Sequence, residues 1–222
     1  MNGLLQSVFS WLSRLVSRKS SDKKTPTTEP MPIEKQSEKD RGKEVSIPWG
    51  NSVSQTFRDR VVWCADSLGV EVDYLMAVMA WESARTFRSD IRNMAGSGAT
   101  GLIQFMPATA RGLGTNTDEL AKMTPEDQLN YVYRYFLPYR GRLKTLSDVY
   151  MAVLWPRAIG KPEGYVLWNK ASRPTTYRQN AGLDIDGDES ITKAEAARKV
   201  EIELYRGMLP ENKWVGVVYP DS

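Results

Sequence analysis

The stretch YLMAVMAWESARTF, residues 74–87, most constrains the fold, because it predicts a helix that is almost wholly apolar until Glu82 and Ser83 near its end. Glu82 follows Met79 by three residues and Leu75 by seven, so its carboxyl lies at the edge of an apolar stripe. Desolvation there disfavours the charged form and raises the pKa of Glu82. A carboxyl that stays protonated close to neutrality can donate a proton to a leaving oxygen, as cleavage of a glycosidic bond requires.

Two absences restrict the remaining chemistry. The chain of 222 residues has no histidine and one cysteine, Cys64. These counts exclude histidine-assisted nucleophiles, histidine metal sites, intrachain disulfides and thiolate zinc sites. Cys64 lies in an amphipathic helical pattern, which predicts a buried, inert thiol. The net charge of +3 is too small for the dense basic surface of a nucleic-acid-binding protein, so no nucleic-acid partner is expected.

The residues after Glu82 favour a ligand-binding site over the alternative of an exposed glutamate paired with Arg85. Residues 93–114, NMAGSGATGLIQFMPATARGLG, begin with glycines that let the backbone approach a ligand closely. Gln104 follows them and offers both a donor and an acceptor for a sugar amide or hydroxyl. Residues 106–110, MPATA, then open a short helix.

Glu82 and Ser83, the glycine-rich loop and GLIQFMPATA at residues 101–110 together resemble the soluble lytic transglycosylase family, whose fold is similar to goose-type lysozyme. The resemblance covers roughly residues 53–207. Within it, SDVYMAVLWPRAIGKPEGYVLW and TYRQNAGLDIDGDESITKAEA look like catalytic domains of endolysins from large bacteriophages. The resemblance implies a mainly α, lysozyme-like catalytic domain that binds peptidoglycan glycan strands.

The same resemblance implies which residues act on the glycan. Glu82 would be the catalytic residue, and Ser83, Gln104 and Met106 would contact the substrate. Glu82 would first protonate the glycosidic oxygen between N-acetylmuramic acid and N-acetylglucosamine. As a carboxylate it would then take the proton of the muramyl C6 hydroxyl, which closes a 1,6-anhydro ring without water, a second carboxylate or a cofactor.

One motif departs from the family. Many members carry AYNAG on the helix that lines the cleft, and AVLWP at residues 152–156 takes that place here, so the polar asparagine is missing. Tyr165 and Tyr177 are candidates to replace its contact with the sugar, because a tyrosine hydroxyl near the acid is common in the family. Ordinary packing is the alternative for each tyrosine.

Two other functions stay open at this point. A hydrolytic muramidase would need a second acid 5–9.5 Å from the first. Asp73 and Asp90 are near in sequence, but Asp73 is expected to cap a helix and Asp90 to lie in a loop. The other alternative is a wall-binding virion protein that does not cut the glycan, although binding alone would not need a desolvated acid.

An acidic segment, DIDGDESITKAE at residues 184–195, resembles an EF-hand calcium loop and implies a structural Ca²⁺. Glu189 replaces the turn-forming glycine of position 6, and a glycine stands at position 4 instead. The alternative is an Asp-rich turn followed by a capping box of Thr192 and Glu195. Positions 1, 3, 5, 7, 9 and 12 are Asp184, Asp186, Asp188, Ser190, Thr192 and Glu195.

Three regions are predicted along the chain. Residues 1–18 carry apolar residues at helical spacing and are expected to contact a membrane or a virion partner, or else to pack on their own domain. Residues 19–46 lack aromatic residues and mix both charge signs, which predicts a flexible linker. The catalytic domain is expected at 47–222. The segment 1–18 is a poor secretory signal, so a phage virion or host-cell location is expected, with action at periplasmic peptidoglycan.

The helices of the domain follow from apolar spacing and cap signals. The clearest start is TPED at residues 124–127, with threonine as the cap, proline first in the helix and acids in the first turn. No strand ladder is predicted, although GLIQF at 101–105 is a candidate for a short extended piece. The expected helices span 54–68 before Gly69, 74 to about 85 after Asp73, 124 to about 138, 146–154, and 193 to near 207.

Overall fold

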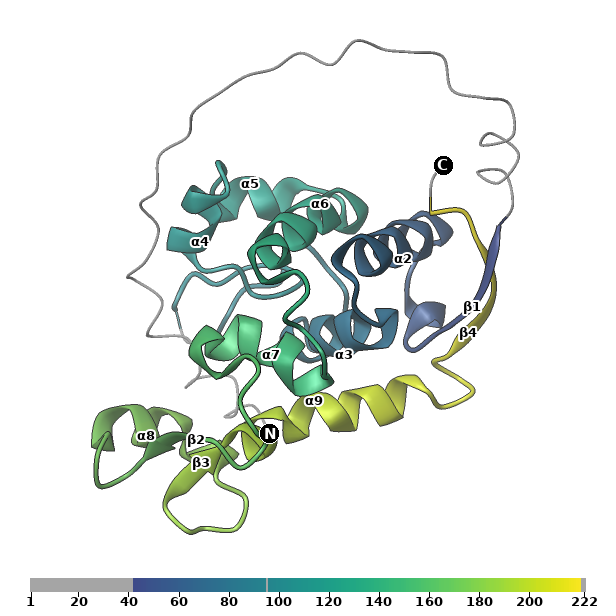
Figure 1. Cartoon of the computed structure of the whole chain (residues 1–222). Coiled ribbons are helices and arrows are strands. Elements are labelled where there is room, and N and C mark those ends of the chain that lie inside the picture. Colours follow the sequence, from purple (N-terminus) through teal and green to yellow (C-terminus); the bar gives the residue numbers. More distant parts are fainter. Residues whose placement is uncertain (1–41, 95, 221–222) are drawn as a thin grey trace.

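The computed structural model describes residues 42–94 and 96–220, and the predictions for 1–18 and for most of 19–46 lie outside these residues (Figure 1). The described part is mainly helical, as predicted. None of its helices is long and apolar enough to cross a membrane. The α-helices are α2 (Gln55–Leu68), α3 (Val72–Glu82), α4 (Pro107–Gly112), α5 (Thr117–Lys122), α6 (Pro125–Phe136), α7 (Leu146–Leu154), α8 (Pro174–Asn180) and α9 (Lys193–Gly207).

Local cap signals set most of the helix ends. Thr124 accepts a hydrogen bond from the backbone N–H of Asp127 at the start of α6. The capping box of Thr192 and Glu195 is formed in full at the start of α9. α7 spans Leu146–Leu154, as predicted. α2 ends at Leu68 and is capped by Gly69, whose φ of 69° is the left-handed conformation that glycine adopts without a steric penalty.

The predicted bounds of α3 were wrong at both ends. The helix begins at Val72 with Glu71 as its cap, so Asp73 lies inside the first turn. It ends at Glu82 and not near Arg85, because Ala84 and Arg85 adopt left-handed backbone conformations that cannot continue a right-handed helix.

Two small antiparallel sheets contradict the expectation that strands are absent. β1 (Lys43–Ile47) pairs with β4 (Trp214–Val218), with Lys43 opposite Val218. The domain therefore starts before the predicted boundary at Ile47. β2 (Val166–Asn169) pairs with β3 (Ser190–Thr192). GLIQF is not a strand, since residues 101–104 form a turn and only isolated bridges flank it.

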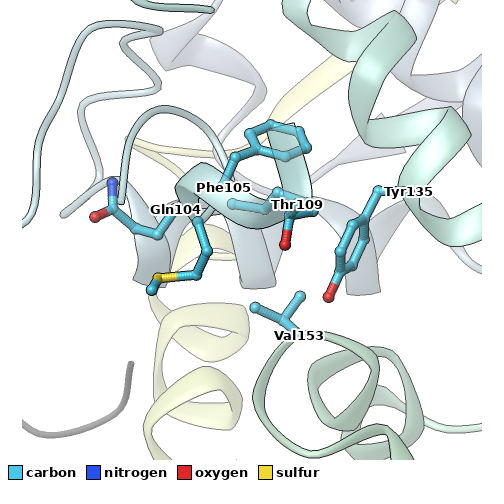
Figure 2. Close-up of a pocket in the computed structure, with 7 residues that line it drawn as sticks. Gln104, Phe105, Thr109, Tyr135 and Val153 are labelled. Carbon is cyan, nitrogen blue, oxygen red and sulfur yellow. The ribbon is translucent and has the colours of Figure 1, made fainter. Parts of the chain in front are cut away.

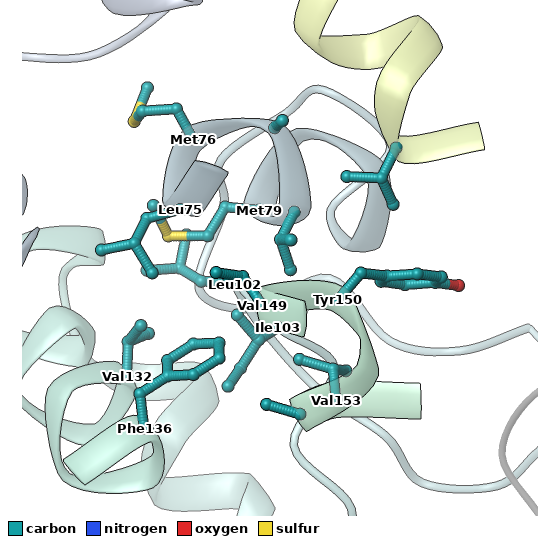
Figure 3. Packing of buried hydrophobic residues seen from close by; sticks show 14 of the residues in the cluster. Leu75, Met76, Met79, Leu102, Ile103, Val132, Phe136, Val149, Tyr150 and Val153 are labelled. Carbon is teal, nitrogen blue, oxygen red and sulfur yellow. The ribbon is translucent and has the colours of Figure 1, made fainter. Parts of the chain in front are cut away.

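Helix α3 lies at the centre of the hydrophobic core. Leu75 through Ala80 are all buried to 1% exposure or less, on every side of the helix. A helix that is apolar all round must be covered by neighbours on all sides, and α3 packs against α2, α7 and the long α9 (Figure 1). Figure 3 shows Leu75 and Met79 of α3 facing Leu102, with Phe136 of α6 beyond it.

A buried ion pair joins α9 to α7. The ammonium of Lys193 lies 2.7 Å from Asp148 Oδ1 and donates to the backbone carbonyl of Lys161 at 2.8 Å. Both charged side chains are almost fully buried, at 2% and 4% exposure. The backbone N–H of Gly160 donates to the same carboxylate at 2.7 Å. Because each charge is compensated, the pair fixes the first turn of α9 to the first turn of α7.

We expect Lys193→Met to lower the free energy of unfolding by about 3–5 kcal/mol, because it leaves the buried Asp148 carboxylate without its cation. Lys122→Met is the matched control, since Lys122 pairs with Glu119 on the surface and such pairs contribute about 0–1 kcal/mol. Urea unfolding of both variants measures the two changes. Equal small losses would show that the buried pair is not needed to hold α9 on α7.

Candidate active site

The carboxyl of Glu82, at the end of α3, is removed from water. The residue is 3% exposed, and its Oε2 is fully buried without a hydrogen-bond partner among the described residues. Burial raises the pKa of Glu82 to about 8, in the direction that the sequence predicts. The alternative of an exposed glutamate paired with Arg85 is wrong, because Arg85 pairs with Glu203 of α9 instead.

Two tyrosines that the sequence analysis missed lie near Glu82. The hydroxyl of Tyr135, on α6, donates to the backbone carbonyl of Ala152 at 2.7 Å. The hydroxyl of Tyr150, on α7, is buried and has no hydrogen-bond partner in the described part of the chain. Burial raises the pKa of both tyrosines, and the nearby charge of Glu82 contributes to both shifts. Both hydroxyls therefore stay neutral beside the acid.

The turn after Glu82 is built by its own side chains. Ser83 is fully buried, and its Oγ accepts a hydrogen bond from the backbone N–H of Phe87 at 3.0 Å. The hydroxyl of Thr86 donates back to the Ser83 carbonyl at 2.7 Å. Ser83 thus stabilises the turn from inside the protein, and the predicted contact with substrate is not supported in this conformation.

A buried glutamine holds the glycine-rich loop in place. Gln128, on α6, accepts a hydrogen bond from Leu102 N at 2.7 Å and donates to the carbonyls of Ser89 and Leu120. Gly101 has a φ of 84°, and a Cβ at this position would lie 2.2 Å from the Gln128 amide oxygen. Glycine is therefore required at this position, where the loop approaches α6.

Gln104 is less available to a sugar than the sequence predicts. The residue is buried, its φ is 50°, and its amide nitrogen donates to the carbonyls of Ile91 and Gly101, both at 3.2 Å. In Figure 2 its side chain points away from Tyr135 and Val153. The donors of the amide are thus engaged within the protein, and only its oxygen is left for a ligand.

A small groove lies beside this loop, between the start of α4, α6 and the end of α7. Figure 2 shows Thr109 and Tyr135 directing their hydroxyls toward the space next to Val153. Met106 and Tyr135 both line the groove, and the predicted contact of Met106 with substrate stays a prediction. Glu82 does not line the groove, but its charge acts on Tyr135. The lining residues are Ile103, Gln104, Phe105, Met106, Thr109, Tyr135 and Val153.

Neither tyrosine predicted to replace the missing asparagine lines the groove. Tyr177, on α8, donates its hydroxyl to Asp184 Oδ2 at 2.5 Å and so belongs to the acidic loop. Tyr165 precedes β2, and its carbonyl accepts from Lys193 N at the start of α9. Tyr165 therefore lies beside the first turn of α9. The residue of α9 that contacts the turn after Glu82 is Glu203, which lies ten residues, or about 15 Å of helix, beyond Lys193. The local sequence did not indicate these partners for either tyrosine.

The acidic loop folds into a turn whose carboxylates converge. Oxygens of Asp184, Asp186 and Asp188 all lie within 4.8 Å of one another. Glu189 adopts a φ of 66°, so it supplies the left-handed residue that glycine provides at position 6 of an EF-hand. Glu195 was also a predicted ligand, but its carboxylate oxygens accept hydrogen bonds from Ile185 N and from Thr192 N and Oγ1. The predicted ligand Ser190 accepts a hydrogen bond at its Oγ from Asn169.

Asp73 and Asp90, the two acids considered as partners of Glu82 in hydrolysis, are not paired with it. Asp73 lies nine residues earlier on α3, about 13 Å along the helix axis. Asp90 is exposed and forms two hydrogen bonds with Arg88, which lower its pKa. Cys64 is buried, as predicted, and burial raises its pKa to about 12, so its thiol stays protonated. No acid lines the groove among the described residues, and Glu82 is a buried acid whose charge acts on Tyr135 of the lining.

The fold and the site define a class: a lysozyme-like helical domain with one desolvated acid at the end of its central helix. Residues 64–153, from α2 to the end of α7, match the family model of the transglycosylase SLT domain. This match supports the lytic transglycosylase, lysozyme-like family that the sequence resembles, so the recognised family is confirmed at that level. No curated protein matched the chain. The narrower likeness to bacteriophage endolysins stays a prediction.

We expect Glu82→Gln to stabilise the protein at neutral pH and not at acid pH. The native pKa of about 8 exceeds the ordinary value of 4.5. Between these values the unfolded chain releases the proton and the native chain keeps it, so wild-type stability falls as pH rises, by at most about 1.4 kcal/mol per pH unit. Below 4.5 both states are protonated and the cost disappears. Unfolding free energies at pH 4 to 8 test this, and parallel curves for the two proteins would contradict it.

Proposed function

We propose that the protein is a peptidoglycan lytic transglycosylase that cleaves the β-1,4 bond between N-acetylmuramic acid and N-acetylglucosamine, with Glu82 in both proton transfers. The observation that carries the proposal is the buried carboxyl of Glu82, whose pKa is raised to about 8. It lies within an SLT domain, and Tyr135 links it to the groove.

The reaction balances with this single acid. The Glu82 carboxyl donates its proton to the glycosidic oxygen as the C1–O bond breaks, and N-acetylglucosamine leaves with a free 4-hydroxyl. The Glu82 carboxylate then takes the proton of the muramyl C6 hydroxyl while that oxygen bonds to C1. The product is a 1,6-anhydro sugar, and Glu82 is again protonated, so no water is consumed.

The alternatives are a hydrolytic muramidase and a wall-binding protein that does not cut. Hydrolysis by paired acids needs a second carboxylate about 5–9.5 Å away. Asp73 lies about 13 Å from Glu82 along α3, and Asp90 is bound to Arg88 at the surface. A pure binding protein has no need of a carboxyl that is held dry. The intramolecular route therefore suits this site better than either alternative.

We further propose, from the sequence alone, a phage-derived enzyme of cell-wall lysis or entry that reaches periplasmic peptidoglycan from a virion or from the host cell. Residues 1–18 would contact a membrane or a virion partner, and residues 19–41, the part of the predicted linker before β1, would tether the domain. Truncation of residues 1–41 tests this role, since it should spare cleavage of isolated walls and reduce association with membranes or particles.

Glu82→Gln should reduce cleavage of purified peptidoglycan by about 100-fold or more, because general acid–base catalysis contributes about 10²–10⁴-fold. Glu119→Gln is a matched control on the surface and should keep full activity. Turbidity loss measures the rate, and mass spectrometry of the muropeptides identifies the products.

Wild-type products should carry 1,6-anhydro ends. Reducing ends would establish hydrolysis and reject the intramolecular route. Wall binding without any cleavage by the wild type would reject the enzyme and favour the binding protein. Substantial residual cleavage by Glu82→Gln would remove Glu82 from the catalytic role.

We also propose that the loop of residues 184–195 holds a structural Ca²⁺, with Asp184, Asp186 and Asp188 as its ligands. The three converging carboxylates and the left-handed Glu189 fit such an ion. The ion would neutralise the negative charges of these three carboxylates. The loop runs directly into α9, whose Lys193 is anchored on α7, and no proton transfer passes through it.

Saturating Ca²⁺ should raise the melting temperature relative to a chelator by about 5–11 °C, since a ligand at 100 times its Kd adds about 2.7 kcal/mol and 1 kcal/mol shifts Tm by about 2–4 °C in a domain of this size. Asp186→Asn with Asp188→Asn should abolish the shift, whereas Asp118→Asn, on α5, should keep it. The same melting temperature in Ca²⁺ and in chelator would reject the ion.

A further inference from the structure

The turn that follows Glu82 adopts an unfavourable backbone conformation. Ala84, Arg85 and Phe87 have φ angles of 51°, 65° and 49°. These left-handed values are uncommon for residues other than glycine, and they persist only where the surrounding structure enforces them. Ser83 and Thr86 provide local hydrogen bonds. The contact that reaches the turn from α9 is the ion pair of Arg85 with Glu203.

Glu203 is a buried carboxylate with two cations. Its side chain is 2% exposed, with Oε2 at 3.0 Å from Arg85 Nε and Oε1 at 2.7 Å from Arg206 Nη1. Its backbone carbonyl also accepts the indole N–H of Trp49 at 2.8 Å. Such a pair adds little net stability over apolar packing, but loss of one partner leaves a buried charge uncompensated. An arrangement of this kind is better suited to fixing geometry than to adding stability.

We propose that Glu203 and Arg85 are positioning residues for the catalytic acid: their ion pair anchors the left-handed turn to α9 and so holds the Glu82 carboxyl in its water-free place. The inference rests on the proposed function only in calling Glu82 the catalytic acid. Arg206 occupies the other oxygen of Glu203 from the same helix, three residues on, and does not touch the turn.

The charges around Glu82 predict how the anchor affects its titration. Tyr135, from α6, and Tyr150, from α7, lie near Glu82 and stay neutral. Arg85 is the nearest cation along its own chain, and it shares the Glu203 carboxylate with Arg206. Release of the turn in Arg85→Gln or Glu203→Gln would admit water to Glu82 and so lower its pKa. In Glu203→Gln the freed charge of Arg85 would act in the same direction, whereas Arg85→Gln acts through water alone.

The test compares Arg85→Gln with Arg206→Gln in the full chain. Each variant removes one arginine from Glu203, but only Arg85 belongs to the turn. Titration of the ¹³C-labelled Glu82 carboxyl by NMR and the pH dependence of peptidoglycan cleavage are measured for both, together with their melting temperatures.

We expect Arg85→Gln to shift the Glu82 titration down by about one pH unit or more. Cleavage should fall about twofold at pH 7 and about tenfold at pH 9, because a one-unit shift lowers the ratio of protonated to ionised Glu82 tenfold. Glu203→Gln should shift it in the same direction. Arg206→Gln should lower the melting temperature without moving the titration. Arg85→Lys, which keeps a cation for Glu203, should recover part of the shift, and it replaces Arg85→Gln if that variant does not fold.

An unchanged Glu82 titration in Arg85→Gln and Arg85→Lys, or equal shifts in Arg85→Gln and Arg206→Gln, would overturn the inference and leave the pair a structural contact. The NMR titration needs no substrate. A wild type that fails to cut peptidoglycan while Arg85→Gln still shifts Glu82 would therefore reject the proposed function and retain the positioning pair.

Discussion

The desolvation of the Glu82 carboxyl is the constraint on which the rest of the site depends. Ionising a carboxyl at 3% exposure is unfavourable, and burial raises its pKa to about 8. The surroundings preserve that state, since α3 is apolar on every side and the two nearby tyrosines contribute neutral hydroxyls. A protonated acid at neutral pH is thus a product of the whole core rather than of one local contact.

Helix α9 contacts both the turn that follows this acid and the helix that forms one side of the groove. Near its start, Lys193 is bound to Asp148 on α7, the helix that carries Val153 of the groove. Ten residues later, Glu203 is bound to Arg85 in the turn after Glu82. The buried Lys193–Asp148 pair and the pair of half-exposed Arg85 with buried Glu203 therefore join both regions to one helix. The acidic loop leads directly into the first turn of this helix (Figure 1).

Sequence reasoning succeeded where the determining interactions are local. The bounds of α7, the cap of α6 and the burial of Glu82 follow from spacing and from neighbours within one turn. It failed where a partner comes from a distant segment. The β1–β4 pairing joins the two ends of the domain. Tyr135 reaches the acid from another helix, whereas Tyr177 turns to Asp184, and apolar periodicity cannot tell which hydroxyl finds which partner.

The missing asparagine of the family motif changes what the groove can offer a sugar. Val153 lines the groove at that place, and both Val153 and Leu154 are nearly buried. These apolar side chains offer a sugar no hydrogen bond where the asparagine would stand. Tyr135 already donates its proton to Ala152, so its hydroxyl oxygen can only accept from a ligand. A sugar N–H or O–H suits this acceptor.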